Sequence, residues 1–242
     1  MTRAGRRAFL TVFTLAALGA LIALGVWQLQ RRDWKNALIA RFETALTEQP
    51  RAYEPPRAGG NRAREFARVR ADGVFLPQAE VKVSTPAPEA ARAHTQENFG
   101  YLLFTPLKFD GGIVFVNRGF VPQSLSGRTG FLPQGTAGVT GILRLPEEPN
   151  WFTFTPDPAK RLFYIADIRA MAAATGLDKD GAAILSEYIQ EEPRPGGPQW
   201  PLARDPGELL ASIPNRHLEY AVTWFGLALA LAGVYGVYML RD

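Results

Sequence analysis

The run AFLTVFTLAALGALIALGVWQL, residues 8–29, contains no charged side chain. As a helix, a run of this length crosses the roughly 30 Å hydrocarbon core of a bilayer. A second charge-free run, residues 220–240, is similarly long and carries aromatic side chains that suit a membrane interface. The sequence therefore predicts a hairpin of two transmembrane helices, one near each end of the chain, with a domain between them.

A cleaved signal peptide is the alternative interpretation of the first run. Arg3, Arg6 and Arg7 precede the apolar residues, as the basic residues of a signal peptide do. The run is longer than the apolar region of a signal peptide, however, and residues 27–32 offer no small-residue cleavage site. We therefore expect the first run to be retained as a membrane anchor.

The two runs define the expected organisation of the chain. It comprises a tail (1–7), a first transmembrane helix (8–30), a β-rich domain (31–214), a second transmembrane helix with its entrance (215–240) and a short tail (241–242). Residues 34–48 carry apolar side chains at helical spacing, so the first helix continues or restarts there as an amphipathic segment. Arginines flank both ends of the first run, and charge alone does not choose the side of the membrane.

The middle segment shows the patterns of short strands. Its strongest signal is a hairpin, in which residues 101–109 and 113–116 flank Asp110-Gly111-Gly112. Periodicity predicts further strands at 138–145 and 183–190 and a helix near 165–175. We expect an α+β membrane protein whose domain is an antiparallel β-sheet or small barrel. The Pro- and Gly-rich residues 193–214 indicate a linker that returns to the bilayer.

Composition excludes several classes of site. The chain has no cysteine, which removes disulfides, thiolate catalysis and covalent c-type haem attachment. The net charge of +4 is modest, and the arginines are spread along the chain, so a nucleic acid is not an expected partner. The anionic head groups of the bilayer fit the arginine clusters beside the first span better.

The sequence carries no catalytic motif, and we expect no enzyme. The two histidines, His94 and His217, lie in a polar loop and at a membrane edge, so a hydrolase triad is not supported. We interpret His94 as solvated and the acidic pairs 147–148 and 191–192 as solvated turns. Glycines 135, 138 and 141 indicate a turn that enters a strand, because their spacing does not fit a phosphate-binding loop.

His217 is of interest because it lies at the entrance of the second span. Aromatic and basic residues from both spans are expected at the same membrane edge: Tyr220, Trp224, Trp27, Arg31 and Arg32. A neutral imidazole can ligate haem iron, flat aromatic rings can pack on a macrocycle, and arginines can bind propionates. The set suits a tetrapyrrole. The same residue types also serve as ordinary interface anchors, so both interpretations stay open.

Small residues favour contact between the two spans. Ala228, Ala232 and Gly236 recur every four residues on the second span, and the pairs 16/20 and 19/23 do so on the first. Helices with such stripes approach each other closely. The same faces could contact another membrane protein, and the pattern does not separate the two cases.

Four segments together resemble the surfeit locus protein 1 family of cytochrome c oxidase assembly factors. They occur in order along nearly the whole chain and read Gly25-x-Trp27-Gln28-x-x-Arg31-Arg32-x-Trp34-Lys35, Val116-Asn117-Arg118-Gly119-Phe120-Val121-Pro122, Pro198-Gln199-Trp200-Pro201 and Asn215-x-His217-Leu218-x-Tyr220-Ala221-x-Thr223-Trp224-Phe225. Arg216 departs from the family pattern, in which an Asn commonly precedes the His.

The resemblance implies a function that composition and periodicity do not. It implies a domain in the bacterial periplasm or the mitochondrial intermembrane space, and insertion of haem a into the large cytochrome c oxidase subunit. Proteins of haem a synthesis and oxidase assembly are implied partners. Our hypothesis is that His217 ligates the iron, with aromatic side chains packing the ring and basic ones near the propionates: Tyr220, Trp224, Trp27, Arg31 and Arg32.

A scaffold that binds no haem is the alternative function. It would stabilise an intermediate of the oxidase subunit through its domain and its helix faces. Residues 117–122 could then form a contact surface, although we expect a rigid structural turn there.

Overall fold

The structure is a computed structural model that describes residues 3–56, 64–127, 135–179, 181–194, 196, 199–211 and 213–241. It divides into two compact units, Met1–Arg41 with Ala211–Asp242 and, separately, Phe42–Leu210. Pro198 of the third motif and the outermost residues of both predicted tails lie outside the described residues.

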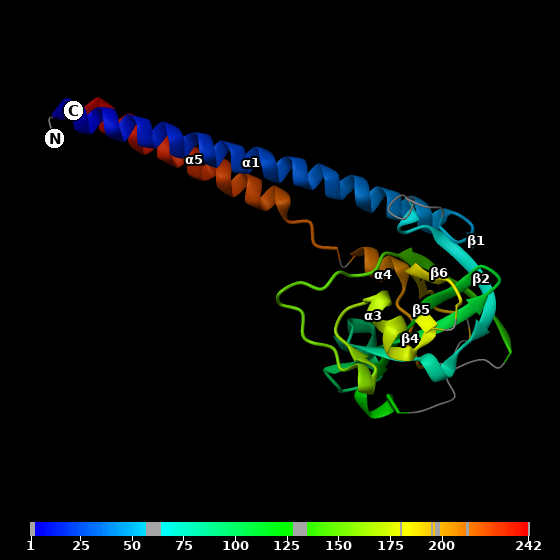
Figure 1. Ribbon diagram of the computed structural model, residues 1–242. Helices are drawn as coiled ribbons and strands as arrows, with labels where there is room; N and C mark the ends of the chain where they lie inside the picture. Colours follow the sequence, from blue (N-terminus) through cyan, green and yellow to red (C-terminus); the bar gives the residue numbers. More distant parts are fainter. Residues whose placement is uncertain are drawn as a thin grey trace. The chain divides into compact units, whose positions relative to one another are not determined.

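The first unit is a helical hairpin. Helix α1 (Arg3–Thr47) and helix α5 (His217–Arg241) run antiparallel, side by side (Figure 1). Both are long and apolar enough to cross a membrane, which agrees with the two predicted spans. Helix α1 has no break after the apolar run, so the amphipathic residues 34–48 continue the first helix as far as Thr47 instead of restarting it.

The contact between α1 and α5 follows a heptad pattern. The less exposed positions of α5 alternate in steps of four and three: His217, Ala221, Trp224, Ala228, Leu231, Tyr235 and Tyr238. Those of α1 do the same: Thr14, Leu18, Leu21, Gly25, Gln28, Arg32 and Lys35. A repeat of 3.5 residues gives the left-handed packing of a coiled coil. We call these two rows the seam.

Gly25 lies in the seam beside Phe225. A Cβ atom at this position would lie 2.6 Å from the ring of Phe225, so a larger residue would require that ring to move. The predicted contact between the spans is confirmed, and Ala228 is buried in it. The prediction that the small pairs of α1 make the contact is wrong, because residues 16, 19, 20 and 23 are all exposed.

The second unit is a small β-barrel with additional strands attached to two of its strands. Its strands are β1 (Arg51–Ala52), β2 (Arg68–Phe75), β3 (Val81–Pro86), β4 (Phe99–Phe109), β5 (Gly112–Pro122), β6 (Thr136–Arg144), β7 (Leu162–Phe163) and β8 (Ile184–Glu191). They form one sheet in the order β1-β2-β6-β8-β5-β4-β3-β7, and β2 also pairs with β4. That pairing closes β2, β6, β8, β5 and β4 into a ring, as the predicted α+β small barrel requires.

The predicted hairpin forms the centre of the sheet. Strands β4 and β5 pair antiparallel from Phe109 opposite Gly112 onward. Strand β5 then continues to Pro122, so the expected turn over residues 117–122 is wrong. The segment stays extended because β4 pairs with it on one side and β8 on the other, as far as Asn117 opposite Gln190.

Successive side chains of β5 point to opposite faces of the sheet, so they belong to two different apolar layers. Val114 and Val116 belong to a cluster with residues of all five ring strands, which is the interior of the barrel. Ile113 and Phe115 face the other way and pack with Met171 of helix α3 (Ile168–Thr175). One side of β5 therefore points into the barrel, and the other faces a covering layer.

The covering segments are short. Helix α3 begins where the Asp167 carboxylate accepts a hydrogen bond from the Ala170 N–H and ends at Gly176 with φ +77°. Ile165, which the prediction placed in this helix, therefore lies outside it. The described residues also form helix α4 (Pro206–Ala211) and the 3-10 turns η1 (Pro77–Ala79), η2 (Glu89–Ala93), η3 (Gln123–Leu125), η4 (Pro158–Lys160) and η5 (Leu177–Lys179). The expected turn at Gly135 is confirmed, since β6 begins at the next residue.

The expected linker, residues 193–214, is partly packed on the barrel. Leu202 and Phe120 exchange two backbone hydrogen bonds of 2.8 and 2.9 Å. Trp200 and Leu202 also pack against the buried ring of Phe120. A segment rich in Pro and Gly therefore covers the end of β5 before the chain reaches α5.

Candidate functional site

His217 is the first residue of α5 and pairs with α1. Its Nδ1 lies 2.8 Å from Oε1 of Gln28 in the seam. In this orientation of the Gln28 amide the imidazole Nδ1 is the donor, because an amide oxygen only accepts hydrogen bonds. The lone pair of a neutral ring then lies on Nε2, which is the form that ligates a metal.

The entrance of α5 is held in place by polar contacts with α1. The side-chain amide of Asn215 donates a hydrogen bond to Oδ1 of Asn36 over 2.7 Å. The Lys35 ammonium donates to the carbonyl oxygen of Pro214. These contacts fix the start of the helix beside Gln28, and so they orient the imidazole.

Trp224 is two turns into α5, on the same row as His217. Its indole Nε1 is buried and has no hydrogen-bond acceptor among the described residues. An unsatisfied donor is unfavourable away from water, and such a group is available to a ligand that brings an acceptor.

The two predicted basic residues have different surroundings. The Arg31 guanidinium lies 4.1 Å above the ring of Trp34 and forms no ion pair with a described residue. Arg32 instead pairs with Asp33, with Nη2 and Oδ1 2.8 Å apart, so its charge is partly compensated. Arg31 is therefore the more available cation at this edge.

Trp27 and Tyr220 lie outside the seam. Their side chains are 54% and 55% exposed in the hairpin, as expected for residues that face lipid or a bound molecule. The structure thus brings His217, Trp224 and Arg32 onto the seam and leaves the other predicted residues beside it. Sequence reasoning assigned no role to Gln28, although a polar residue near the end of an apolar span was a usable signal.

A second polar centre lies inside the barrel. Arg118 is 2% exposed, and its Nε lies 3.6 Å from Oε2 of Glu191. The other carboxylate oxygen of Glu191 is 2.8 Å from Nη2 of Arg194. Burial lowers the pKa of Arg118 and raises the pKa of Glu191, while their mutual attraction opposes both shifts.

The expected solvated turn at residues 191–192 is wrong. Glu191 is 4% exposed as the last residue of β8, and the carboxylate of Glu192 pairs with Arg68 at 2.8 Å. The acidic pair 147–148 is exposed, and so is His94, as predicted. No group of three or more His, Cys, Asp or Glu side chains within the described ranges could hold a metal ion.

Glu187 is a second buried carboxylate, also inside the barrel. The Tyr53 hydroxyl donates a hydrogen bond to it over 3.0 Å, and Arg64 lies 3.6 Å away. Burial raises the pKa of Glu187 above its ordinary value, and the attraction of Arg64 opposes the shift. Burial, followed by repulsion from Glu187, raises the pKa of Tyr53.

The raised pKa of Glu187 predicts a pH dependence of stability. The folded chain binds this proton more tightly than the unfolded chain, so the contribution is full at low pH and is lost as the pH rises through the folded pKa. We expect Glu187→Gln to gain stability relative to the wild type as the pH rises above 4.5, the ordinary pKa of a glutamate. Thermal unfolding at a series of pH values upward from there, with the exposed Glu148→Gln as control, measures the difference. A difference that stays constant with pH would contradict the assignment.

Comparison with known proteins identifies relatives that match most of the chain. The model of the SURF1 family matches residues 15–229. Surfeit locus protein 1 of Rattus norvegicus is 31% identical over 92% of this chain and 73% of its own length. The protein of the same name from Homo sapiens is 28% identical over 99% of this chain and 81% of its own length. A SURF1-like protein of Monosiga brevicollis is 30% identical over 85% and 78%, respectively. The chain belongs to the SURF1 family.

Proposed function

We propose that this chain is a cytochrome c oxidase assembly factor that binds haem a through His217 and assists its insertion into the large oxidase subunit. The coarse role follows from membership of the SURF1 family, whose proteins are known as assembly factors for this oxidase. The finer role rests on one observation, the hydrogen bond between His217 and Gln28. With Nδ1 as the donor to Gln28, a neutral ring presents its Nε2 lone pair at the edge of the hairpin.

The residues present fit such a group. Haem a, when bound, supplies an iron that accepts an imidazole nitrogen as an axial ligand. His217 offers Nε2 for this purpose, and Gln28 fixes the tautomer and the ring orientation. The unpartnered indole N–H of Trp224 and the guanidinium of Arg31 offer a donor and a cation to propionates. Trp27 and Tyr220 offer exposed rings that a macrocycle could cover.

The proposal also assigns a place and a mode of action. We place the domain on the outer side of a bacterial plasma membrane or a mitochondrial inner membrane, where the oxidase subunit and the proteins of haem a synthesis would meet it. A single side-chain ligand suits a cofactor that is passed on, because few bonds must break at release. The role is one of binding and transfer rather than of catalysis.

Substitution of His217 tests the proposal. We expect His217→Ala to abolish the haem absorbance of the protein purified from cells that make haem a. His94→Ala is the matched control, because it removes the one other histidine, which is exposed, and should retain wild-type haem. Gln28→Leu should weaken haem retention by about 10- to 100-fold, the usual effect of losing the partner of a ligating histidine. Wild-type stoichiometry and spectrum in His217→Ala would refute ligation.

A scaffold that binds no haem is the second candidate, and an exposed aromatic loop favours it. Trp151, Phe152 and Phe154 are 87%, 72% and 73% exposed, and such a patch commonly marks a protein contact. A scaffold should co-purify with the large oxidase subunit and show no haem spectrum. Loss of co-purification in the triple variant Trp151→Ser/Phe152→Ser/Phe154→Ser, with haem absent from the wild type, would favour it over haem binding.

A further inference from the structure

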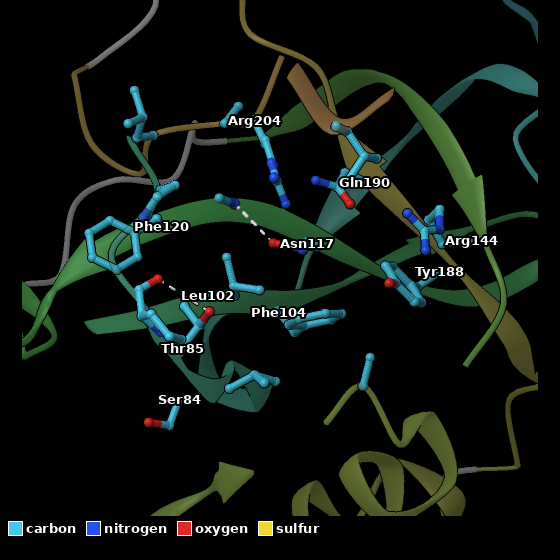
Figure 2. A pocket seen from close by; sticks show the side chains of 18 of the residues that line it. Ser84, Thr85, Leu102, Phe104, Asn117, Phe120, Arg144, Tyr188, Gln190 and Arg204 are labelled. Carbon is cyan, nitrogen blue, oxygen red and sulfur yellow. Dashed lines mark hydrogen bonds between the residues drawn. The ribbon is translucent and has the colours of Figure 1, made fainter. Parts of the chain in front are cut away.

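A pocket lies on the outer face of the barrel, beneath the segments that cover it. Its volume is about 600 Å³, within the range of small-molecule sites. Strands β3, β4, β5, β6 and β8 line it together with residues 164–166 and 202–209 (Figure 2). All of these residues belong to the unit Phe42–Leu210.

Strand register gives the floor of the pocket a row of polar side chains. Asn117 of β5 is opposite Gln190 of β8 and Phe104 of β4. Tyr188, two residues before Gln190 on the same face of β8, is opposite Arg144 of β6. Four strands therefore direct their side chains into one space (Figure 2).

Two uncompensated cations face the pocket. Arg144 and Arg204 both line it, and neither forms a salt bridge with a described residue. The Arg144 guanidinium lies 5.2 Å from the ring of Phe66, and its Nε is buried without a hydrogen-bond partner in the described part of the chain. A buried arginine N–H without a hydrogen-bond acceptor is energetically unfavourable, so a ligand that supplies an acceptor is favoured there.

Two further polar groups of the floor, Asn117 and Tyr188, offer donors as well. Asn117 is 3% exposed, and its Oδ1 already accepts the N–H of Gly119 at 3.1 Å, so its NH₂ group is what it offers to a ligand. Burial raises the pKa of Tyr188 to about 12, so this hydroxyl keeps its proton. The two carboxylates of the lining, Glu147 and Glu208, are exposed at its rim.

Besides Ser84 and Thr85, much of the remaining wall is apolar. Leu102, Phe104 and Phe120 lie next to the donors (Figure 2), and Phe104 and Phe120 are each 1% exposed. Guanidinium groups bind oxyanions with paired hydrogen bonds, and flat apolar walls hold hydrocarbon or aromatic bodies. The lining is thus complementary to a molecule with one anionic end and one apolar end.

We propose that this pocket binds a small amphipathic oxyanion, a carboxylate or phosphate carried on an apolar body, with the oxyanion on Arg144 and Arg204 and the body on Phe104 and Phe120. Lipids and tetrapyrrole carboxylates both carry this chemistry. The site does not depend on the proposed role of His217, because every residue that lines it belongs to the barrel unit.

Titration of the full chain with soluble probes tests the site. We expect 2-naphthoate and 1-naphthyl phosphate to bind the protein in a neutral detergent, and the uncharged 2-naphthamide to bind at least about tenfold more weakly. Arg144→Gln and Arg204→Gln should each weaken the anions about tenfold or more. The control Arg169→Gln changes an exposed arginine of α3 and should leave binding unchanged. Circular dichroism and the melting temperature verify that each variant is folded.

The outcomes decide the proposal and the source of the ligand. Equal binding of the amide and the anions, or wild-type binding in the folded double variant Arg144→Gln/Arg204→Gln, would overturn it. Displacement of 2-naphthoate by palmitate assigns the natural ligand to lipids, and displacement by a metal-free dicarboxylic porphyrin assigns it to tetrapyrroles. Displacement by neither counts against the proposal. The metal-free porphyrin needs no axial ligand, so its result is independent of His217.

Discussion

Gly119→Ala is expected to destabilise the barrel unit by about 3–5 kcal/mol, as the sum of backbone strain and overpacking. Gly119 has φ +116°, a backbone conformation that side-chain-bearing residues rarely adopt. An added Cβ would also collide with the carbonyl group of Leu202 and the backbone nitrogen of Ala203. These are main-chain atoms, so no rotamer change relieves the collision. The segment around Leu202, which is hydrogen-bonded to the backbone of Phe120, must therefore move away.

Gly135→Ala separates the two causes. Gly135 also has a positive φ, of +78°, but a Cβ there would meet no described atom within 4 Å. We expect this variant to lose only about 1–2 kcal/mol, from strain alone. Denaturant unfolding in detergent, followed by far-ultraviolet circular dichroism, compares the two variants. An equal loss in both would show that the contact with Leu202 is unimportant.

Glu191→Gln should destabilise the barrel unit by about 3–5 kcal/mol, because it removes the carboxylate charge that lies against a buried cation. The Arg118 guanidinium is 2% exposed and lies against the carboxylate of Glu191, with the Phe75 ring 5.3 Å away. Arg194 is much less affected, since its side chain is 44% exposed and water can solvate it.

A double variant tests whether the lost charge partner is the cause. Replacement of a whole buried ion pair by apolar residues is often neutral, so Arg118→Met/Glu191→Leu should recover much of the stability lost in Glu191→Gln. Glu148→Gln, at an exposed position, should change the free energy of unfolding by less than about 0.5 kcal/mol. A double variant that is less stable than Glu191→Gln would contradict this account, and the same unfolding measurement decides it.

The sequence predicted correctly those elements that are determined by residues close together in the chain. The two spans need only a long apolar run, and the β4–β5 hairpin needs only two apolar segments around Asp110-Gly111-Gly112. The resemblance to a family rested on short motifs that survive in order along the chain, and the match over residues 15–229 confirmed it.

The elements that were missed depend on partners far along the chain. Residues 117–122 resemble a turn because they contain Gly119 and Pro122, but pairing with β4 and β8 keeps them extended. Glu191 resembles a solvated residue beside a proline, but closure of the barrel buries it against Arg118. Neither the strand pairing of residues 117–122 nor the burial of Glu191 produces a periodic pattern in the sequence of the segment itself.

For the candidate site, the sequence by itself placed His217, the aromatic residues and the arginines at one membrane edge, because the positions of the two spans alone determine that edge. Only the tertiary structure decided that Gln28 fixes the imidazole and that His217 and Trp224 share the seam, since the heptad register of two distant helices sets those contacts. Only the tertiary structure also decided the barrel pocket. Its arginines, at 144 and 204, lie 60 residues apart in sequence. They face one space because strand pairing places Arg144 and the packing of the linker, residues 193–214, on the barrel places Arg204.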